Sequence, residues 1–169
     1  MIWTKRRDSG GLGWVVWHKD LATNTWLRLD STQAETASPA AWGGTFSADT
    51  YTIANDPYDA INGSGGDLIA YLFATLPGVS KVSSYSGTGG NVNVDCGFSA
   101  GARFILIKRT DTEITVAPTT GWYVWDSVRG IVAGNDPYIL LNNALAQVTN
   151  TDYIDPLASG FTVTSNASS

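Results

Sequence analysis

The chain has 169 residues, 43 % hydrophobic and 15 % charged, so its polarity comes from Thr, Ser, Asn and 18 Gly more than from ionised side chains. The formal net charge of −5 argues against a nucleic-acid interface, which needs a basic face. No apolar run approaches the roughly 20 residues of a membrane span, and one Cys and one His exclude an intrachain disulfide and multi-His or Cys-based metal clusters. We therefore expect a β-rich protein with no nucleic-acid partner and no membrane insertion.

Short apolar segments bounded by Gly and polar residues predict strands along the whole chain. They occupy residues 2–6, 14–17, 26–29, 51–53, 68–74, 104–107, 122–125, 138–142 and 161–163. Residues 32–36 and 144–147 follow an Asp or an Asn and are candidates for single helical turns. Helices of any length would need an apolar period of 3.6 residues, which the sequence lacks.

Two halves of the chain resemble each other in four blocks that keep the same order. Ile2 aligns with Ile105, Gly13 with Gly121, Trp26 with Tyr138, and Tyr51 with Phe161. The blocks predict an internal duplication, with a first unit over residues 1–76 that lacks its N-terminal strands. A second unit over residues 77–169 lacks its closing strand. We expect an all-β fold of two related jelly-roll or β-sandwich-like units.

The same blocks resemble a known family. Residues 106–109 (LIKR), 121–127 (GWYVWDS), 138–142 (YILLN) and 160–163 (GFTV) carry the resemblance, with first-unit counterparts at 3–6, 14–17, 26–30, 61–65 and 68–73. The chain is similar here to an uncharacterised tandem β-rich repeat of structural proteins of tailed bacteriophages, as in marine and aquatic phages. The resemblance implies a virion protein, in a tail fibre or tail tip, that contributes to assembly and host-surface contact.

The expected partners follow from this resemblance and from the missing closing strands. Unpaired strand edges invite further strands, so we expect a homo-oligomer, with a trimer favoured by analogy with phage fibres, and contacts with other virion proteins. A host-surface glycan is a further candidate partner. A capsid decoration protein is an alternative within the same class, and a carbohydrate-binding module is an alternative of another class.

Aromatic side chains are the candidates for ligand binding, because flat rings stack on sugar faces. Trp42 lies in a loop without a counterpart in the second half, and Trp26 is a second candidate. Trp14, Trp17, Trp122 and Trp125 occupy equivalent strand positions, which favours a packing role.

Metal binding and catalysis find weaker support. Asp56, Asp59 and Asp67 lie in an oxygen-rich stretch that could hold a hard cation, although Asp and Asn are also common turn residues. Glycoside hydrolysis needs two close carboxylates, and Glu35 and Glu113 have no counterparts in the other half. No nucleophile motif accompanies His18, and Cys96 is expected to be a buried thiol. We expect no catalytic residue, no enzyme activity and no cofactor.

Overall fold

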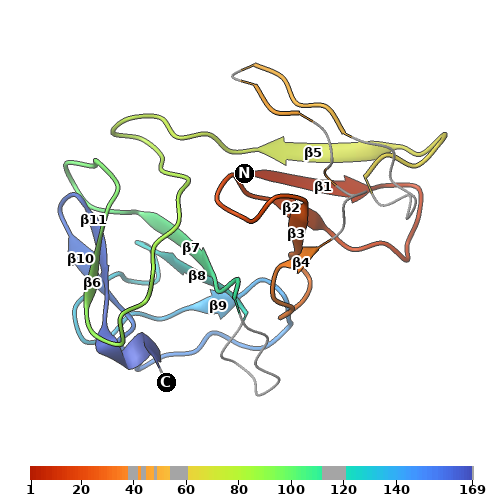
Figure 1. The fold of residues 1–169 in the computed structure, drawn as a ribbon. Coiled ribbons are helices and arrows are strands. Elements are labelled where there is room, and N and C mark those ends of the chain that lie inside the picture. Colours follow the sequence, from red (N-terminus) through yellow and green to blue (C-terminus); the bar gives the residue numbers. More distant parts are fainter. Residues whose placement is uncertain (38–41, 43–44, 48, 54–60, 112–120, 169) are drawn as a thin grey trace. The chain divides into compact units, whose positions relative to one another are not determined.

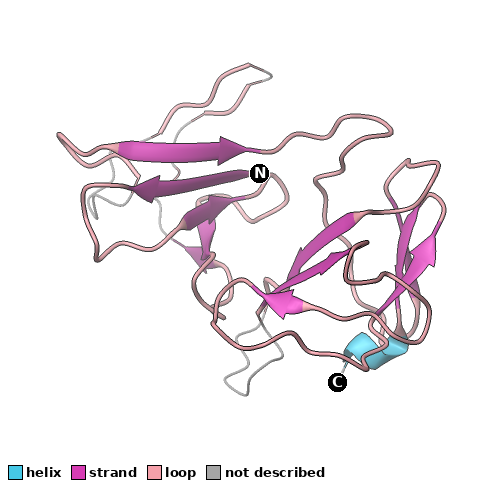
Figure 2. Cartoon of the chain, turned by 180° about the vertical axis from the view of Figure 1, so that it is seen from behind, coloured by secondary structure: helices cyan, strands magenta, loops and turns pink. Residues whose placement is uncertain are grey.

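The computed structural model describes residues 1–37, 42, 45–47, 49–53, 61–111 and 121–168. Almost all regular structure in these ranges is β-strand, arranged in three antiparallel sheets (Figure 1). A 3-10 helix at Ser165–Ser168 is the one helical element drawn in Figure 2 for the described part of the chain. The predicted all-β class is therefore confirmed.

The chain forms two compact units. Met1–Phe73 and Arg109–Thr115 make up the first, and Ala74–Lys108 and Val116–Ser169 make up the second. The division after Phe73 lies close to the boundary expected between residues 76 and 77. The assignment of Arg109–Thr115 to the first unit was not anticipated, and one backbone hydrogen bond accounts for part of it: Glu35 N donates to Thr110 O at 2.9 Å.

The first unit contains one five-stranded sheet in the order β4-β3-β2-β1-β5. Its strands are β1 (Ile2–Arg6), β2 (Val15–Trp17), β3 (Thr25–Arg28), β4 (Thr36–Ala37) and β5 (Leu68–Leu72). Successive side chains of a strand point to opposite faces, so alternate residues of β1 and β2 reach the core. Ile2 and Val15 pack there with Trp42 and Ile61, which come from the long connection between β4 and β5.

The second unit contains two three-stranded sheets. The first sheet has the order β7-β8-β9 and consists of β7 (Phe104–Lys108), β8 (Trp122–Asp126) and β9 (Ile139–Leu140). The second has the order β10-β11-β6 and consists of β10 (Ile154–Leu157), β11 (Gly160–Val163) and β6 (Val92–Asp95). Both sheets contribute to one buried cluster: Ile105, Trp125 and Leu140 come from the first, and Ile154 and Phe161 from the second. This unit is therefore β-sandwich-like.

Strand pairing in the two units follows the same register. In the first unit Ile2 pairs with Trp17 and Trp3 with Val16; in the second, Ile105 pairs with Trp125 and Leu106 with Val124. The correspondence extends to β3 and β9, where Val16↔Leu27 becomes Val124↔Ile139. It extends also to the isolated bridge Phe46↔Tyr51, whose aligned counterpart is Pro156↔Phe161.

The two predicted helical turns are wrong. Residues 32–35 run as irregular chain into β4, because Thr36 pairs with Trp26 and Glu35 Oε2 accepts hydrogen bonds from Ala22 N and Thr25 Oγ1. In the second unit Asn143 Oδ1 accepts a bond from Leu145 N in a local turn, and residues 144–147 are irregular up to the bridge at Val148. An Asn or Asp side chain that hydrogen-bonds to the nearby backbone stabilises turns as well as helix starts. The presence of such a residue therefore did not distinguish a turn from a helix.

No helix in the described residues is long and apolar enough to cross a bilayer.

Candidate interaction surface

An aromatic strip lies on the face of the five-stranded sheet that is opposite to the first unit's core. We define this aromatic strip as Trp3, Trp14, Tyr71 and Phe73. Trp3 contacts Phe73 with ring centroids 4.8 Å apart, and Trp14 contacts Tyr71 at 5.7 Å. The pairing of Trp3 with Tyr71 across β1 and β5 places both rings on one face.

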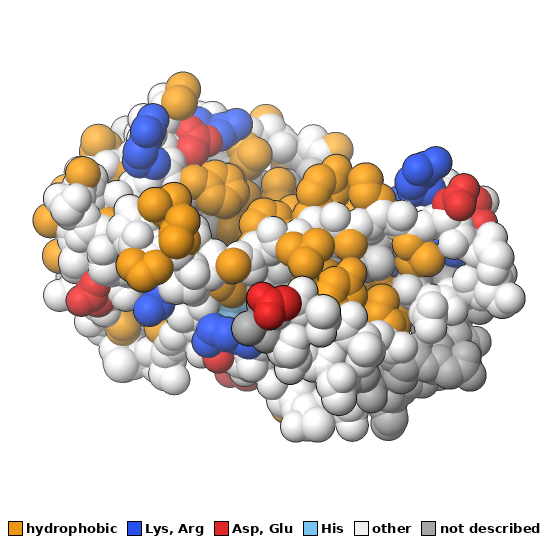
Figure 3. Space-filling view, turned by 90° about the horizontal axis from the view of Figure 1, so that it is seen from above, with side chains coloured by type: hydrophobic (Ala, Val, Ile, Leu, Met, Phe, Trp, Pro, Cys, Tyr) orange, Lys and Arg blue, Asp and Glu red, His pale blue; other side chains and the backbone are white. Residues whose placement is uncertain are grey.

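The strip is exposed on its β5 side. Tyr71 is 49 % exposed and Phe73 39 % exposed, and Ile69, which lies on the same face two residues before Tyr71, is 37 % exposed. Figure 3 looks onto the side of the molecule where β5 lies and shows hydrophobic side chains gathered there. Exposed clusters of large apolar side chains are typical of interaction sites.

Basic side chains border the strip and are held by neighbours. The Lys5 ammonium lies 5.9 Å from the centroid of the Trp14 ring, a cation–π arrangement. Arg6 forms an ion pair with Asp8 at 2.6 Å, and the aligned Arg109 pairs with Asp111 at 2.8 Å. These three basic side chains therefore pair with acids or lie over an aromatic ring.

Two long strands lie at sheet edges in the described part of the chain. β5 and β7 each have five residues, pair with another strand on one side only, and contain no Pro. The other edges are protected: β4 and β9 have two residues each, β10 contains Pro156, and β6 carries Asn93 and Asp95. β5 and β7 are therefore the edges best suited to pair with another strand.

The two tryptophans predicted to bind a ligand lie elsewhere. Trp42 is 3 % exposed and belongs to the first unit's core, where it contacts Phe46 and Tyr51. Trp26 is half-buried against the same core, and the indole nitrogens of both residues are buried. Stacking on a sugar requires an open ring face, and the ring of Trp42 does not offer one. By contrast Trp122 and Trp125 are buried, as expected for packing residues.

The oxygen-rich stretch is described only at its end. Asp56 and Asp59 lie outside the described residues. Asp67 is exposed, and its carbonyl oxygen accepts a hydrogen bond from Arg7 N at 2.7 Å. In the described ranges no three His, Cys, Asp or Glu side chains converge in a way that could hold a metal ion.

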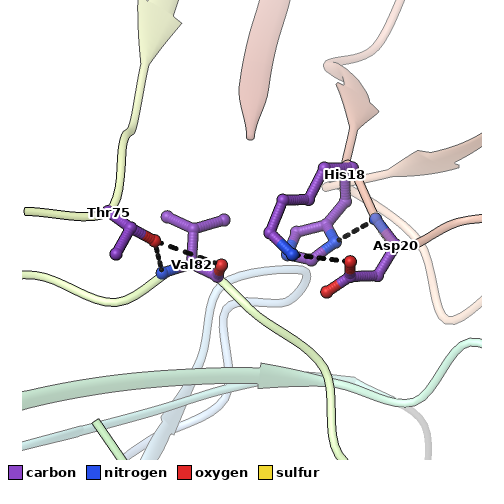
Figure 4. A network of polar contacts seen from close by, with 5 residues as sticks. His18, Asp20, Thr75 and Val82 are labelled. Carbon is purple, nitrogen blue, oxygen red and sulfur yellow. Dashed lines mark hydrogen bonds and ion pairs between the residues drawn. The ribbon is translucent and has the colours of Figure 1, made fainter. Parts of the chain in front are cut away.

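His18 and Glu35 have local structural roles. His18 Nδ1 accepts a hydrogen bond from Asp20 N at 3.2 Å, and burial lowers the pKa of its imidazole (Figure 4). Figure 4 also shows Thr75, whose Oγ1 accepts a bond from Val82 N at 3.0 Å and so closes the loop after β5. Glu35 accepts the hydrogen bonds described above, and Glu113 lies outside the described residues.

Two buried groups occupy the second unit's interior. Cys96 is 8 % exposed, and burial raises the pKa of its thiol, as expected for a packing residue. Asp136 is fully buried, and its carboxylate accepts hydrogen bonds from Tyr153 N at 2.8 Å and Ile154 N at 3.1 Å. Burial raises the pKa of Asp136 to about 6, although these two bonds act in the opposite direction.

Sequence reasoning missed the aromatic strip. Residues 68–73 are almost uniformly apolar, so no alternation distinguishes Tyr71 and Phe73 from the residues that face the core. The signal that could have found them is the pairing of β5 with β1, because it places Tyr71 opposite Trp3.

The arrangement defines an all-β protein with an exposed aromatic strip and two five-residue strands, β5 and β7, whose outer edges pair with no described strand. The chain matches, over residues 1–169, the model of a family described as a domain of unknown function (DUF7483), and it belongs to that family. No curated protein and no solved structure matches it.

Proposed function

We propose that the chain is a structural protein of a tailed-bacteriophage virion, in the tail fibre or tail tip, that assembles with copies of itself and with other virion proteins. The repeated sequence blocks, which resemble the phage tandem repeat, carry this proposal. The open edges of β5 and β7 and the exposed aromatic strip support it, because edges and apolar patches are the surfaces through which β-proteins assemble.

The proposal is tested by locating the chain in particles of a phage that encodes it. Mass spectrometry of purified virions is expected to detect the chain, and antibody labels viewed by electron microscopy are expected to bind the tail. Antibody labels that bind the head instead of the tail would identify the chain as a capsid decoration protein. A chain that is synthesised during infection but absent from purified particles would overturn the proposal.

Self-assembly is tested on the purified chain. Light scattering is expected to give a mass that is a multiple of 18.0 kDa, with three copies as the favoured form. A mass of one chain at all concentrations would contradict self-assembly.

Carbohydrate binding is a second candidate function, favoured by the aromatic strip rather than by Trp42 and Trp26. If the strip binds a host glycan, Tyr71→Ala should weaken binding on a glycan array at least tenfold, because it removes an exposed ring. Val128→Ala is the matched control, since Val128 is a 94 % exposed apolar residue of the second unit. Equal binding by both variants would remove the strip as a glycan site.

A further inference from the structure

The open edge of β7 corresponds to an edge that is occupied in the first unit. β1 lies between β2 and β5, and β7 pairs with β8 in the register in which β1 pairs with β2. On its other side β1 pairs with β5 over five residues, whereas no described strand pairs with β7 there.

The alternation of hydrogen bonds identifies the backbone groups at this edge. Ser127 N donates to Arg103 O, so Ile105 and Ile107 have the parity that bonds to β8, and Phe104 and Leu106 direct their N–H and C=O groups to the open side.

The first unit shows what binds such groups. Arg7 N donates to Asp67 O and Phe73 N to Met1 O, so Trp3, which lies between them with the same parity, bonds to Tyr71 of β5. Leu106 is the residue aligned with Trp3.

The side chains also fit a strand of this kind. In the first unit Ala70 and Leu72 of β5 lie opposite Thr4 and Ile2, on the core face of the sheet. The residues aligned with Ile2 and Thr4 are Ile105 and Ile107, which belong to or pack against the second unit's core. A strand with the β5 alternation would therefore place its Ala opposite Ile107 against this core, as Ala70 packs against the first unit's core, whereas Leu72 at the end of β5 is 63 % exposed.

We propose that the open edge of β7 binds an antiparallel strand of β5-type sequence from another polypeptide chain, with its Tyr opposite Leu106 and its Leu opposite Ile105. Main-chain bonds at Phe104 and Leu106 provide the attachment, and the alternation of small and large apolar side chains provides the specificity. Binding of a strand at β7 would be one route to the assembly proposed above, and it rests on that proposed function only for the biological source of the strand.

The test adds a synthetic peptide, residues 67–74 of this chain, at a dilution at which the protein is a single chain by light scattering. Amide hydrogen exchange measured by NMR is the readout. Without peptide, the Phe104 and Leu106 amides should exchange fast and those of Ile105 and Ile107 slowly. With peptide, the Leu106 amide should slow at least tenfold. The same peptide with Tyr71→Pro should leave it unchanged, because it lacks the central N–H.

A protein variant provides a second arm. Leu106→Pro removes the amide that faces the open edge but keeps the bonds from Ile105 and Ile107 to β8, so the variant should fold and lose peptide binding. The exchange measurement on the unmodified protein decides the question even if this variant fails to fold.

Three results would overturn the proposal: no slowing of the Leu106 amide at saturating peptide, slowing only at Ala70 on the outer edge of β5, or equal slowing by the Tyr71→Pro peptide. None of them bears on whether the chain is found in virions, so the failure of this inference and the failure of the proposed function are distinguishable.

Discussion

The carboxylate of Asp136 organises the chain before β10 at the level of single atoms. One oxygen accepts the Tyr153 amide and the other accepts the Ile154 amide. In Asp136→Asn one of these positions becomes an NH₂ group, which leaves a buried N–H without an acceptor. We expect a loss of about 1–3 kcal/mol in the free energy of unfolding, measured by urea denaturation. Asp49→Asn, at an exposed position, is the control and should be nearly neutral.

The pKa of Asp136 predicts a pH dependence with a defined sign. The native carboxyl binds a proton below about pH 6, whereas the same group in the unfolded chain does so only below about pH 4. Between these values the native state binds more protons, so the contribution of Asp136 to stability decreases as pH rises. The stability difference between the unmodified chain and Asp136→Asn should therefore be larger at pH 5 than at pH 7. An equal difference, or a larger one at pH 7, would contradict this.

Gly121 is required by the side chain that lies over it. Asn142 Oδ1 accepts the Trp122 amide at 2.9 Å, and a Cβ on Gly121 would lie 2.8 Å from that oxygen. The aligned Gly13 has the same relation to Asp30, whose Cγ would be 2.7 Å away. We expect Gly121→Ala to destabilise the chain by about 1–3 kcal/mol, because Asn142 must move and its bond is lost. Gly87→Ala, with open space around it, should not show this loss in the same unfolding assay.

At the scale of elements, periodicity and strand composition predicted the strands that carry large apolar residues. β1, β2, β5 and β9 fall within expected segments, and β3, β7, β8 and β11 each extend one residue beyond theirs. β10 was not predicted, because the sequence Ile-Asp-Pro-Leu contains two turn-forming residues. Pro156 is tolerated since β10 is an edge strand, and the order of strands in a sheet is a tertiary property that local sequence does not reveal.

The central strand β11 should be destabilised by a proline, a residue that the edge strand β10 accommodates at Pro156. Thr162 pairs with Asp155 on one side and Asn93 on the other, so its backbone lies within the sheet. We expect Thr162→Pro to cost about 3 kcal/mol or more, because the ring removes an amide and restricts φ. Circular dichroism and urea unfolding would measure the loss. Thr162→Val, which keeps the backbone amide, is the control, and equal stability of the two variants would argue against the central position.

At the scale of the whole molecule, the structure divides the chain into two compact units, and their relatedness stays a prediction from the repeated blocks. The assignment of Arg109–Thr115 to the first unit depends on long-range contacts such as the bond from Glu35 N to Thr110 O. The position of Trp42 was misjudged for a similar reason, because a Gly- and Ala-rich connection gives no sign that its one large ring enters a core. Neither property follows from the local pattern of residues.

The two cores should respond independently to substitution. Ile2 belongs to the first unit's cluster and Ile154 to the second, and the two clusters share no residue in the described ranges. Ile2→Val and Ile154→Val should each cost about 0.5–1.5 kcal/mol. In the double variant the two costs should add within about 0.5 kcal/mol, as determined by urea unfolding. A larger deviation would reveal energetic coupling between the clusters.

The shared pairing register has a consequence for recognising distant relatives of this chain. Trp3 aligns with Leu106 and Arg28 with Leu140, and the partners across the ladder keep the same order in both units. The connection from β1 to β2 spans residues 7–14 and that from β7 to β8 spans residues 109–121, so the paired positions keep their order although the connection differs in length. Because the register is shared where the residues differ, a comparison of strand pairing can detect similar units that a comparison of residue identities would miss.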